Sequence, residues 1–315
     1  MFNRLPAYRA IVIVAFMMRT VPTAALVAFC SARLFAQGAP ESVYAPPELP
    51  RQGEGTNLGG VHFDVSLSYF TDYVYRGVEV FEAPGAEDQL NLQLDTKVSF
   101  DLGKLPHPFV SVFVNVGEND PISDFQEIRP ILGFDWTLKP FVFSAGHISY
   151  IYPDRDAYET SEVFVKIALD DAVLFRGATV PAPYALAAYD YDLYDGLYLE
   201  AGIKYRVPFD DLGIQFTAIG NVAYVNGFNT RIEDAGGGLI PGFFTNQLTT
   251  GDSVSGFQHW QVGLIGEYSL NQLFDASSRY GVWSIRGYVF YTEGIDDDIR
   301  AENQLWGGAG ITFQY

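Results

Sequence analysis

From about residue 59 to its end, the chain alternates apolar and polar residues with a period of two. Between Leu90 and Leu102 every second residue is apolar except Thr96, and every residue between them is polar. A helical step of 100° would scatter both sets around a cylinder, whereas a strand places them on opposite faces. The pattern therefore predicts half-buried β-strands.

Twelve segments follow this rule, and their number predicts the fold. An even number of antiparallel strands lets an up-and-down barrel close with both ends of the sheet on one side, and closure requires the first strand to pair with the last. We therefore expect an all-β, transmembrane, antiparallel up-and-down barrel. The expected strands are 60–76, 89–102, 108–117, 124–138, 140–152, 160–170, 178–189, 196–207, 212–226, 257–270, 281–293 and 302–315.

Three features indicate that the apolar faces point outward to lipid. Twelve strands enclose more volume than one layer of side chains fills, since about eight strands suffice for that. The connections divide into shorter turns and longer acidic loops, of which 227–256 is the longest, as in outer-membrane barrels. Aromatic residues collect near the strand ends, where interfacial girdles need them: Tyr73, Tyr75, Trp136, Tyr205, Tyr224, Tyr268, Trp283 and Tyr291.

The N-terminal 58 residues differ from the rest. Residues 1–36 contain four arginines, no acid and short apolar runs, which predicts a secretory signal peptide. Residues 37–58 hold four prolines and three glycines without periodicity, which predicts a flexible tether. The barrel is then expected over 59–315, in an exported protein located in the outer membrane.

Charge and cysteine content narrow the classes of partner and site. Lys+Arg is 19 and Asp+Glu is 38, giving a formal net charge of −19, which argues against nucleic acid as a partner. The single cysteine, Cys30, excludes a disulfide framework and a cysteine-based zinc site. The acidic loops allow two interpretations, solvated loops or bridging by divalent cations. We expect no cofactor, no metal and no catalytic residue.

If the apolar sets face lipid, the opposite sets line the lumen. They contain charges of both signs, which form either an ion-lined constriction or structural ion pairs that fill a narrow lumen. Glu127 with Arg129, and Asp95 with Lys97, are spaced to compensate each other on one strand face. Arg129 and Arg286 are preferred for a constriction. The candidates are Asp95, Lys97, Glu127, Arg129, Glu200, Lys204, Glu267 and Arg286, and Asp64, Asp135 and Lys166 share the expected inward face.

The end of the chain resembles the C-terminal insertion signal of bacterial outer-membrane barrels. Gly310, Phe313 and Tyr315 occupy the matching positions, with Gly308 where a polar residue is usual. The resemblance implies that the barrel-assembly machinery recognises this strand. Outer-membrane lipid and lipopolysaccharide are the other expected partners, together with small solutes.

Three segments resemble the TorF-type family of bacterial outer-membrane porins: 68–77 (SYFTDYVYRG), 146–153 (GHISYIYP) followed by 160–164 (TSEVF), and 191–192 (YD) leading into 196–202 (GLYLEAG). The resemblance implies a porin but no substrate. The chain departs from the family at Val78 and Glu79. From their position at the mouth of the first strand, Asp72, Arg76 and Gly77 have either a structural role, with Arg76 pairing with an acid, or a direct part in the channel mouth.

The sequence therefore predicts an outer-membrane porin that gives small solutes or ions passive passage through a polar lumen. The alternative is a structural or plugged barrel without transport. An outer-membrane hydrolase is a minor alternative, because His147 with Ser149, or His259 with a serine on a neighbouring strand, could meet on one barrel face. We expect the protein not to be an enzyme.

Overall fold

The computed structural model describes residues 60–80, 91–117, 127–153, 156–169, 181–233, 237–245 and 252–315. The predicted signal peptide, 1–36, and the predicted tether, 37–58, lie outside these residues. No helix in the described part of the chain is long and apolar enough to cross a bilayer.

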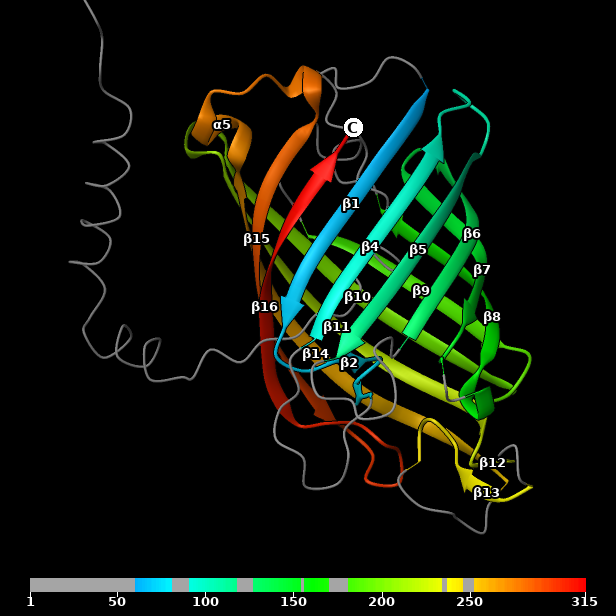
Figure 1. The fold of residues 1–315 in the computed structure, drawn as a ribbon. Helices are drawn as coiled ribbons and strands as arrows, with labels where there is room; N and C mark the ends of the chain where they lie inside the picture. The colour runs from blue at the N-terminus through cyan, green and yellow to red at the C-terminus, as the bar shows by residue number, and fades with distance from the viewer. Residues whose placement is uncertain are drawn as a thin grey trace, which may run out of the picture.

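Twelve antiparallel strands close into one barrel, which confirms the predicted fold class (Figure 1). The closing pair is β1 with β16, in a register that sets Leu67 opposite Ile311. The barrel order is β1 (Val61–Phe70), β16 (Gln304–Gln314), β15 (Val282–Gly294), β14 (Ser253–Ser269), β11 (Ile214–Asn229), β10 (Gly196–Phe209), β9 (Ala182–Asp190), β8 (Thr160–Leu169), β7 (Phe141–Tyr150), β6 (Glu127–Leu138), β5 (His107–Gly117) and β4 (Asn91–Phe100).

The alternation places apolar side chains outside and polar ones inside. Leu132 is 59% exposed and Val165 is 55% exposed on the outer surface, whereas Ser111 and Thr312 are buried on the inner one. A water-soluble barrel would show the opposite arrangement. Strands of 9 to 17 residues are long enough to cross a hydrocarbon layer at a tilt. The outer surface is therefore suited to lipid.

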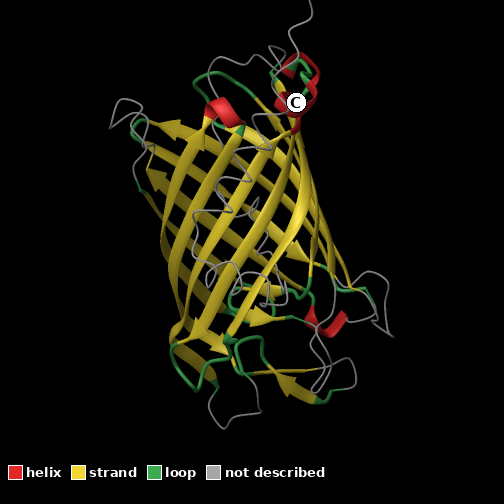
Figure 2. Ribbon diagram, turned by 90° about the vertical axis from the view of Figure 1, so that its left-hand side faces the viewer, coloured by secondary structure: helices red, strands yellow, loops and turns green. Residues whose placement is uncertain are grey.

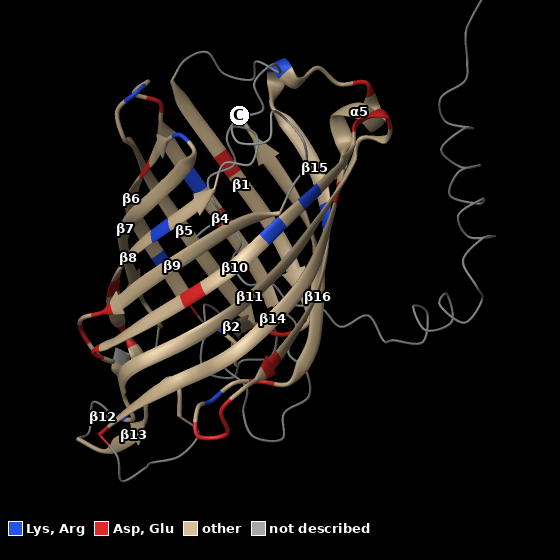
Figure 3. Ribbon diagram, turned by 180° about the vertical axis from the view of Figure 1, so that it is seen from behind, with Lys and Arg blue, Asp and Glu red and all other residues tan. Residues whose placement is uncertain are grey.

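The connections lie at two ends, here called the turn end and the loop end (Figure 2). The turn end holds the C-terminus, η2 (Asp210–Leu212), α5 (Leu270–Phe274) and η3 (Ser278–Tyr280). The loop end holds η1 (Asp156–Tyr158), β12 (Arg231–Glu233) and β13 (Leu239–Pro241). In Figure 3, acidic segments are frequent in the connections at the loop end. The expected asymmetry is incomplete, because α5 and η3 lengthen one connection at the turn end.

One predicted boundary is wrong in an informative way. The first strand was expected to run to residue 76, but β1 ends at Phe70 and the chain turns into the lumen. Tyr73 and Tyr75 were expected in the lipid-facing girdle, yet they are 1% and 3% exposed inside the barrel. The alternation continues past the real strand end because the next segment is a second, inward-folded hairpin with the same period.

Candidate functional site

The segment after β1 forms a short hairpin inside the barrel. β2 (Val74–Tyr75) pairs with β3 (Val78–Glu79), and Arg76 and Gly77 are the two residues between them. Their φ angles are 51° and 72°, and positive values at both positions are what a type I′ turn requires. A backbone bond from Val80 N–H to the Tyr73 carbonyl closes the unit. We call residues 73–80 the lumen hairpin.

Three side chains attach the lumen hairpin to the wall formed by β6, β7 and β8. The Tyr73 hydroxyl donates to Glu127 of β6 at 2.6 Å, and the Tyr75 and Tyr150 hydroxyls lie 2.6 Å apart. Arg76 forms a salt bridge with Glu162 of β8 at 2.7 Å. Tyr150 donates to the same Glu162 oxygen at 2.7 Å. One hydrogen-bonded network therefore joins the hairpin to three successive strands.

Arg129 is the most enclosed cation of this network. Its side chain is 1% exposed, forms an ion pair with Glu127 and donates to the Tyr73 hydroxyl. The guanidinium carbon lies 3.7 Å from the centre of the Tyr75 ring and 4.9 Å from that of Phe113. Aromatic faces attract a cation when water is excluded. Burial also raises the pKa of Tyr73 well above its usual value, so its hydroxyl stays protonated as a donor.

The tip of the lumen hairpin is bonded to a different part of the wall. Gln258 of β14 donates to the Arg76 carbonyl at 2.6 Å, and Glu302 N–H donates to the Gly77 carbonyl at 2.7 Å. Arg300 donates to the Glu79 carbonyl at 2.8 Å. A Cβ at Gly77 would lie 2.5 Å from His259 Nδ1, so the tip fits tightly. The hairpin thus crosses the lumen from β6–β8 to β14 and the β15–β16 connection.

Residues 242–245, at the end of a second described segment, also enter the loop end of the lumen. The Phe244 ring stacks on Tyr198 with centres 6.3 Å apart, and Phe243 meets Tyr75 at 6.3 Å. The guanidinium carbon of Arg76 lies 4.3 Å from the centre of the Tyr198 ring. These rings belong to a buried apolar cluster inside the barrel. Sequence reasoning missed this cluster, although the pair Phe243–Phe244 in an otherwise small-residue loop was a signal for it.

The remaining charged candidates line the wall toward the turn end. Lys97 forms a salt bridge with Asp135 at 2.7 Å, and Ser144 donates to Asp135 at 2.7 Å. Arg286 pairs with Glu267 at 3.1 Å. The spacing of Asp95 and Lys97 predicts that they compensate each other; the salt bridge of Lys97 reaches across β5 to Asp135, while Asp95 is 9% exposed on β4.

Glu200 and Lys204 share the inward face of β10. Glu200 accepts hydrogen bonds from Tyr184 at 2.7 Å and from Tyr198 at 2.8 Å. Lys204 is buried on the same face. Arg129 was expected in mid-strand, but β6 begins at Glu127, so Arg129 belongs to the loop end of the lumen and Arg286 lies deeper.

The motif that follows the first strand and the C-terminal motif lie in different parts of the barrel. Asp72 is buried beside the start of the lumen hairpin and accepts a hydrogen bond from Thr71 at 3.1 Å. Gly310 lies on β16 between Ser68 of β1 and Arg286 of β15. The Phe313 ring meets Trp283 at 4.5 Å and stacks on Tyr315 at 6.5 Å. The last two aromatic residues therefore extend the seam where the barrel closes.

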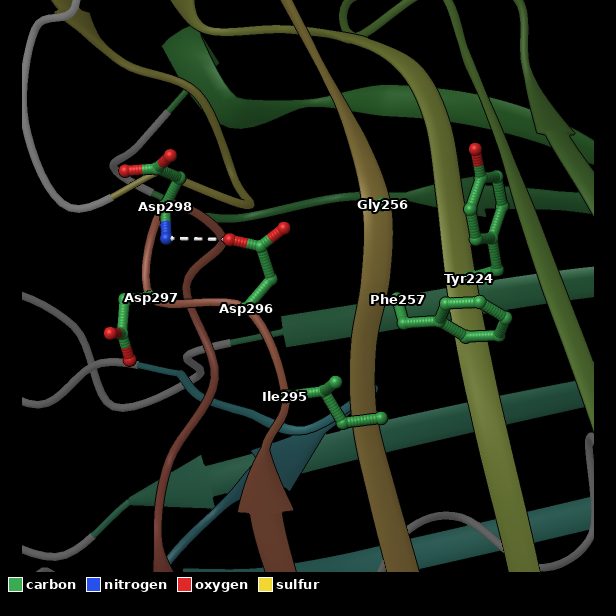
Figure 4. Close-up of a pocket in the computed structure, with 7 residues that line it drawn as sticks. All are labelled: Tyr224, Gly256, Phe257, Ile295, Asp296, Asp297 and Asp298. Atoms are coloured by element: carbon green, nitrogen blue, oxygen red, sulfur yellow. Dashed lines mark hydrogen bonds between the residues drawn. The ribbon is translucent and has the colours of Figure 1, made fainter.

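Figure 4 shows a pocket of about 660 Å³ at the loop end, between β14 and the β15–β16 connection. Its rings, Tyr224 and Phe257, are 5.3 Å apart, and its other wall is acidic. Asp298 N–H donates to Asp296 at 3.0 Å within that wall. No cluster of His, Cys, Asp and Glu suited to a metal ion occurs in the described residues. The lining consists of Tyr224, Gly256, Phe257, Ile295, Asp296, Asp297 and Asp298.

The histidine arrangements that a hydrolase would need are not formed. His147 Nε2 lies 2.6 Å from the Tyr191 hydroxyl, and Ser149 lies 3.5 Å from Ser161. His259 is buried beside Gln258, with Nδ1 2.9 Å from its side-chain oxygen. Neither histidine makes a hydrogen bond to a serine within the described part of the chain.

Comparison with known proteins identifies no family for this chain. Neither a protein-family model nor a curated protein sequence matches the chain, so membership of the TorF-type porins stays a prediction. An outer-membrane channel from Pseudomonas putida F1 is 10% identical, with 84% of this chain and 98% of that one covered and a TM-score of 0.44. The NanC porin is 9% identical, with 80% of this chain and 97% of that one covered and a TM-score of 0.40. A Rh. blastica porin variant is 8% identical, with 81% of this chain and 99% of that one covered and a TM-score of 0.28.

Proposed function

We propose that this protein is an outer-membrane channel for small solutes or ions, and that the structure represents its closed state. The outward apolar surface supports placement in a membrane. The inward charges toward the turn end, such as Lys97, Asp135, Glu267 and Arg286, are 13–18% exposed and so retain some access to water. We propose that passage is passive, down the concentration gradient of the solute.

The observation behind this proposal is the lumen hairpin. It is a separate hairpin within a loop, and it is held by hydrogen bonds and ion pairs from side chains of the wall. Such a unit can leave the lumen without breaking a bond of the barrel ladder. Folded proteins can open locally, in cooperative units that often coincide with supersecondary motifs, while the rest of the fold stays intact.

The second candidate is a plugged barrel without transport. Its support is the burial of both ion pairs of the hairpin network: the side chains of Arg76, Glu162, Arg129 and Glu127 are 0–7% exposed. Moving buried, paired charges apart costs several kcal/mol, about 3–5 when one partner is removed. A hairpin held this firmly is consistent with permanent closure.

Planar-bilayer recording of the refolded protein separates the two candidates. The channel predicts discrete conductance steps from a closed baseline, with a reversal potential in a salt gradient that reports the sign of the preferred ion. The acidic loops favour cations, since they raise the local cation concentration, although salt screens this effect. Continuous silence from protein shown to be folded and inserted would refute the channel and favour the plugged barrel.

A further inference from the structure

The connection between β14 and β15, residues 270–281, exposes large apolar side chains at the turn end. Leu273 is 52% exposed, Phe274 is 71% exposed and Tyr280 is 76% exposed. Exposed apolar side chains that are grouped, rather than scattered singly, mark an interaction site.

The connection holds these side chains on a rigid support. Ser269 caps α5 by accepting from Gln272 N–H, and Gln272 donates to the Asp211 carbonyl of the neighbouring turn at 3.1 Å. Asn271 binds both sides of the connection: it accepts from Trp283 N–H at 2.6 Å and donates to the Gly281 carbonyl at 2.9 Å. The apolar residues are thus presented in a fixed geometry, which lowers the entropic cost of binding.

The position of α5 identifies the partner as lipid. In Figures 1 and 3, α5 projects sideways beyond the barrel wall, at the end that carries the C-terminus. Other exposed apolar side chains lie beside this group: Trp283, which is 43% exposed, is hydrogen-bonded to Asn271, and Phe209 and Leu212 flank the turn that Gln272 contacts. Because α5 lies beside the lipid-facing wall of the barrel, its exposed side chains face the membrane that surrounds this wall.

The chemistry of the connection fits the boundary between hydrocarbon and headgroups. Leu270, Leu273 and Phe274 recur at the spacing of one helical face, while Asn271 lies on another face and Asp275 is the C-cap that ends α5. Tyr280 adds a ring with a polar tip, a residue type that is enriched at membrane interfaces. Apolar and aromatic residues on one face of a helix that lies in the interface form an anchor.

We infer that residues 270–281 are an interfacial anchor that inserts Leu273, Phe274 and Tyr280 into the phospholipid leaflet at the turn end. This inference rests on the proposed membrane location. The anchor would fix the depth and tilt of the barrel on the side of β14 and β15. It requires no second copy of the chain and no protein partner.

A spin label at position 274 tests the anchor. The variant is C30S/F274C, full-length, refolded into phosphatidylcholine vesicles, with collision rates measured for oxygen and for a water-soluble nickel chelate. Two matched labels calibrate it: V289C on the lipid-facing wall and E233C in the exposed loop end, each with C30S. We expect the ratio of the oxygen collision rate to the nickel collision rate to be several-fold higher at position 274 than at position 233. The ratio at 274 should be close to the ratio at 289.

Each other outcome has a distinct meaning. If 289 contacts lipid and 274 behaves like 233, the anchor is refuted and the membrane location stands. If 289 also behaves like 233, the membrane location itself fails. Spin–spin broadening at 274 that disappears on dilution with unlabelled protein would show a second copy on this surface and refute the lipid assignment.

Discussion

Replacing Glu162 by Gln perturbs the closed lumen at one atom pair while leaving the barrel wall intact. Glu162 points inward from β8, so the substitution alters no lipid contact and no ladder hydrogen bond. The amide still accepts hydrogen bonds from Arg76 and Tyr150, but it no longer carries the charge that opposes Arg76. The expected result is a lumen hairpin that leaves its seat more often.

The magnitude follows from the burial of the pair. Arg76 is 7% exposed and Glu162 is 1% exposed at an N–O distance of 2.7 Å. Removing one partner of such a buried pair costs about 3–5 kcal/mol, whereas an exposed pair is worth about 0–1 kcal/mol. Because the Arg76 charge is solvated once the hairpin leaves, the cost falls on the closed state. At about 1.36 kcal/mol per tenfold, the open fraction rises by about two to four orders of magnitude.

Single-channel recording measures this change as open probability at fixed voltage. Glu233→Gln is the matched control, because it makes the same chemical change at an exposed site at the loop end. Arg76→Gln should also favour opening, by leaving Glu162 without that partner. The double variant R76Q/E162Q should open less than the two single effects predict together, since a neutral pair buries no charge.

Open probability that is the same in Glu162→Gln, Glu233→Gln and the parent protein would refute the reasoning. So would additive effects in the double variant, because additivity would show that the two side chains do not act as a pair in the closed state.

Three further predictions concern the hairpin tip, the deeper lumen and the seam. Gly77→Ala should raise the open probability, because alanine is strained at φ 72° and its Cβ would meet His259; an unchanged recording would show that the tip is not seated there. Arg286→Gln leaves Glu267 without its salt-bridge partner, so the reversal potential should shift toward cations, and a shift toward anions would be inconsistent with a conducting lumen at this level. Gly310→Val should prevent closure, because a side chain there meets Ser68 and lies 2.9 Å from the Leu67 carbonyl; the heat-dependent shift of a folded barrel on gel electrophoresis should be lost, and its retention would contradict the β1–β16 pairing.

The barrel could be predicted from the sequence because one physical rule governs every strand. A strand between lipid and lumen must alternate, and Leu90–Leu102 does so almost without exception. The number of strands, their antiparallel order and the pairing of the first with the last followed from this rule and from the need to satisfy every backbone group. The same alternation assigned the inward faces of Glu200 and Arg286.

The closed lumen could not be predicted in the same way. Alternation does not distinguish a wall strand from a hairpin packed inside the barrel, so Tyr73 and Tyr75 were expected on the lipid side. Ion pairs across strands depend on register, which the sequence does not give, and so the salt bridge from Lys97 to Asp135 was not predicted. Thr71-Asp72 and Arg76-Gly77, both turn-forming pairs, are the signals that could have indicated the break after Phe70.

The measurement closest to the central claim compares the parent protein with a variant in which residues 73–80 are replaced by a short Gly-Ser linker, both recorded in planar bilayers. Both proteins must first show the same folded barrel by gel shift and circular dichroism. If the lumen hairpin closes a channel, the parent shows brief openings from a closed baseline and the variant shows long-lived conductance steps. Silence from the inserted variant, or identical steady conductance from both proteins, would contradict that account.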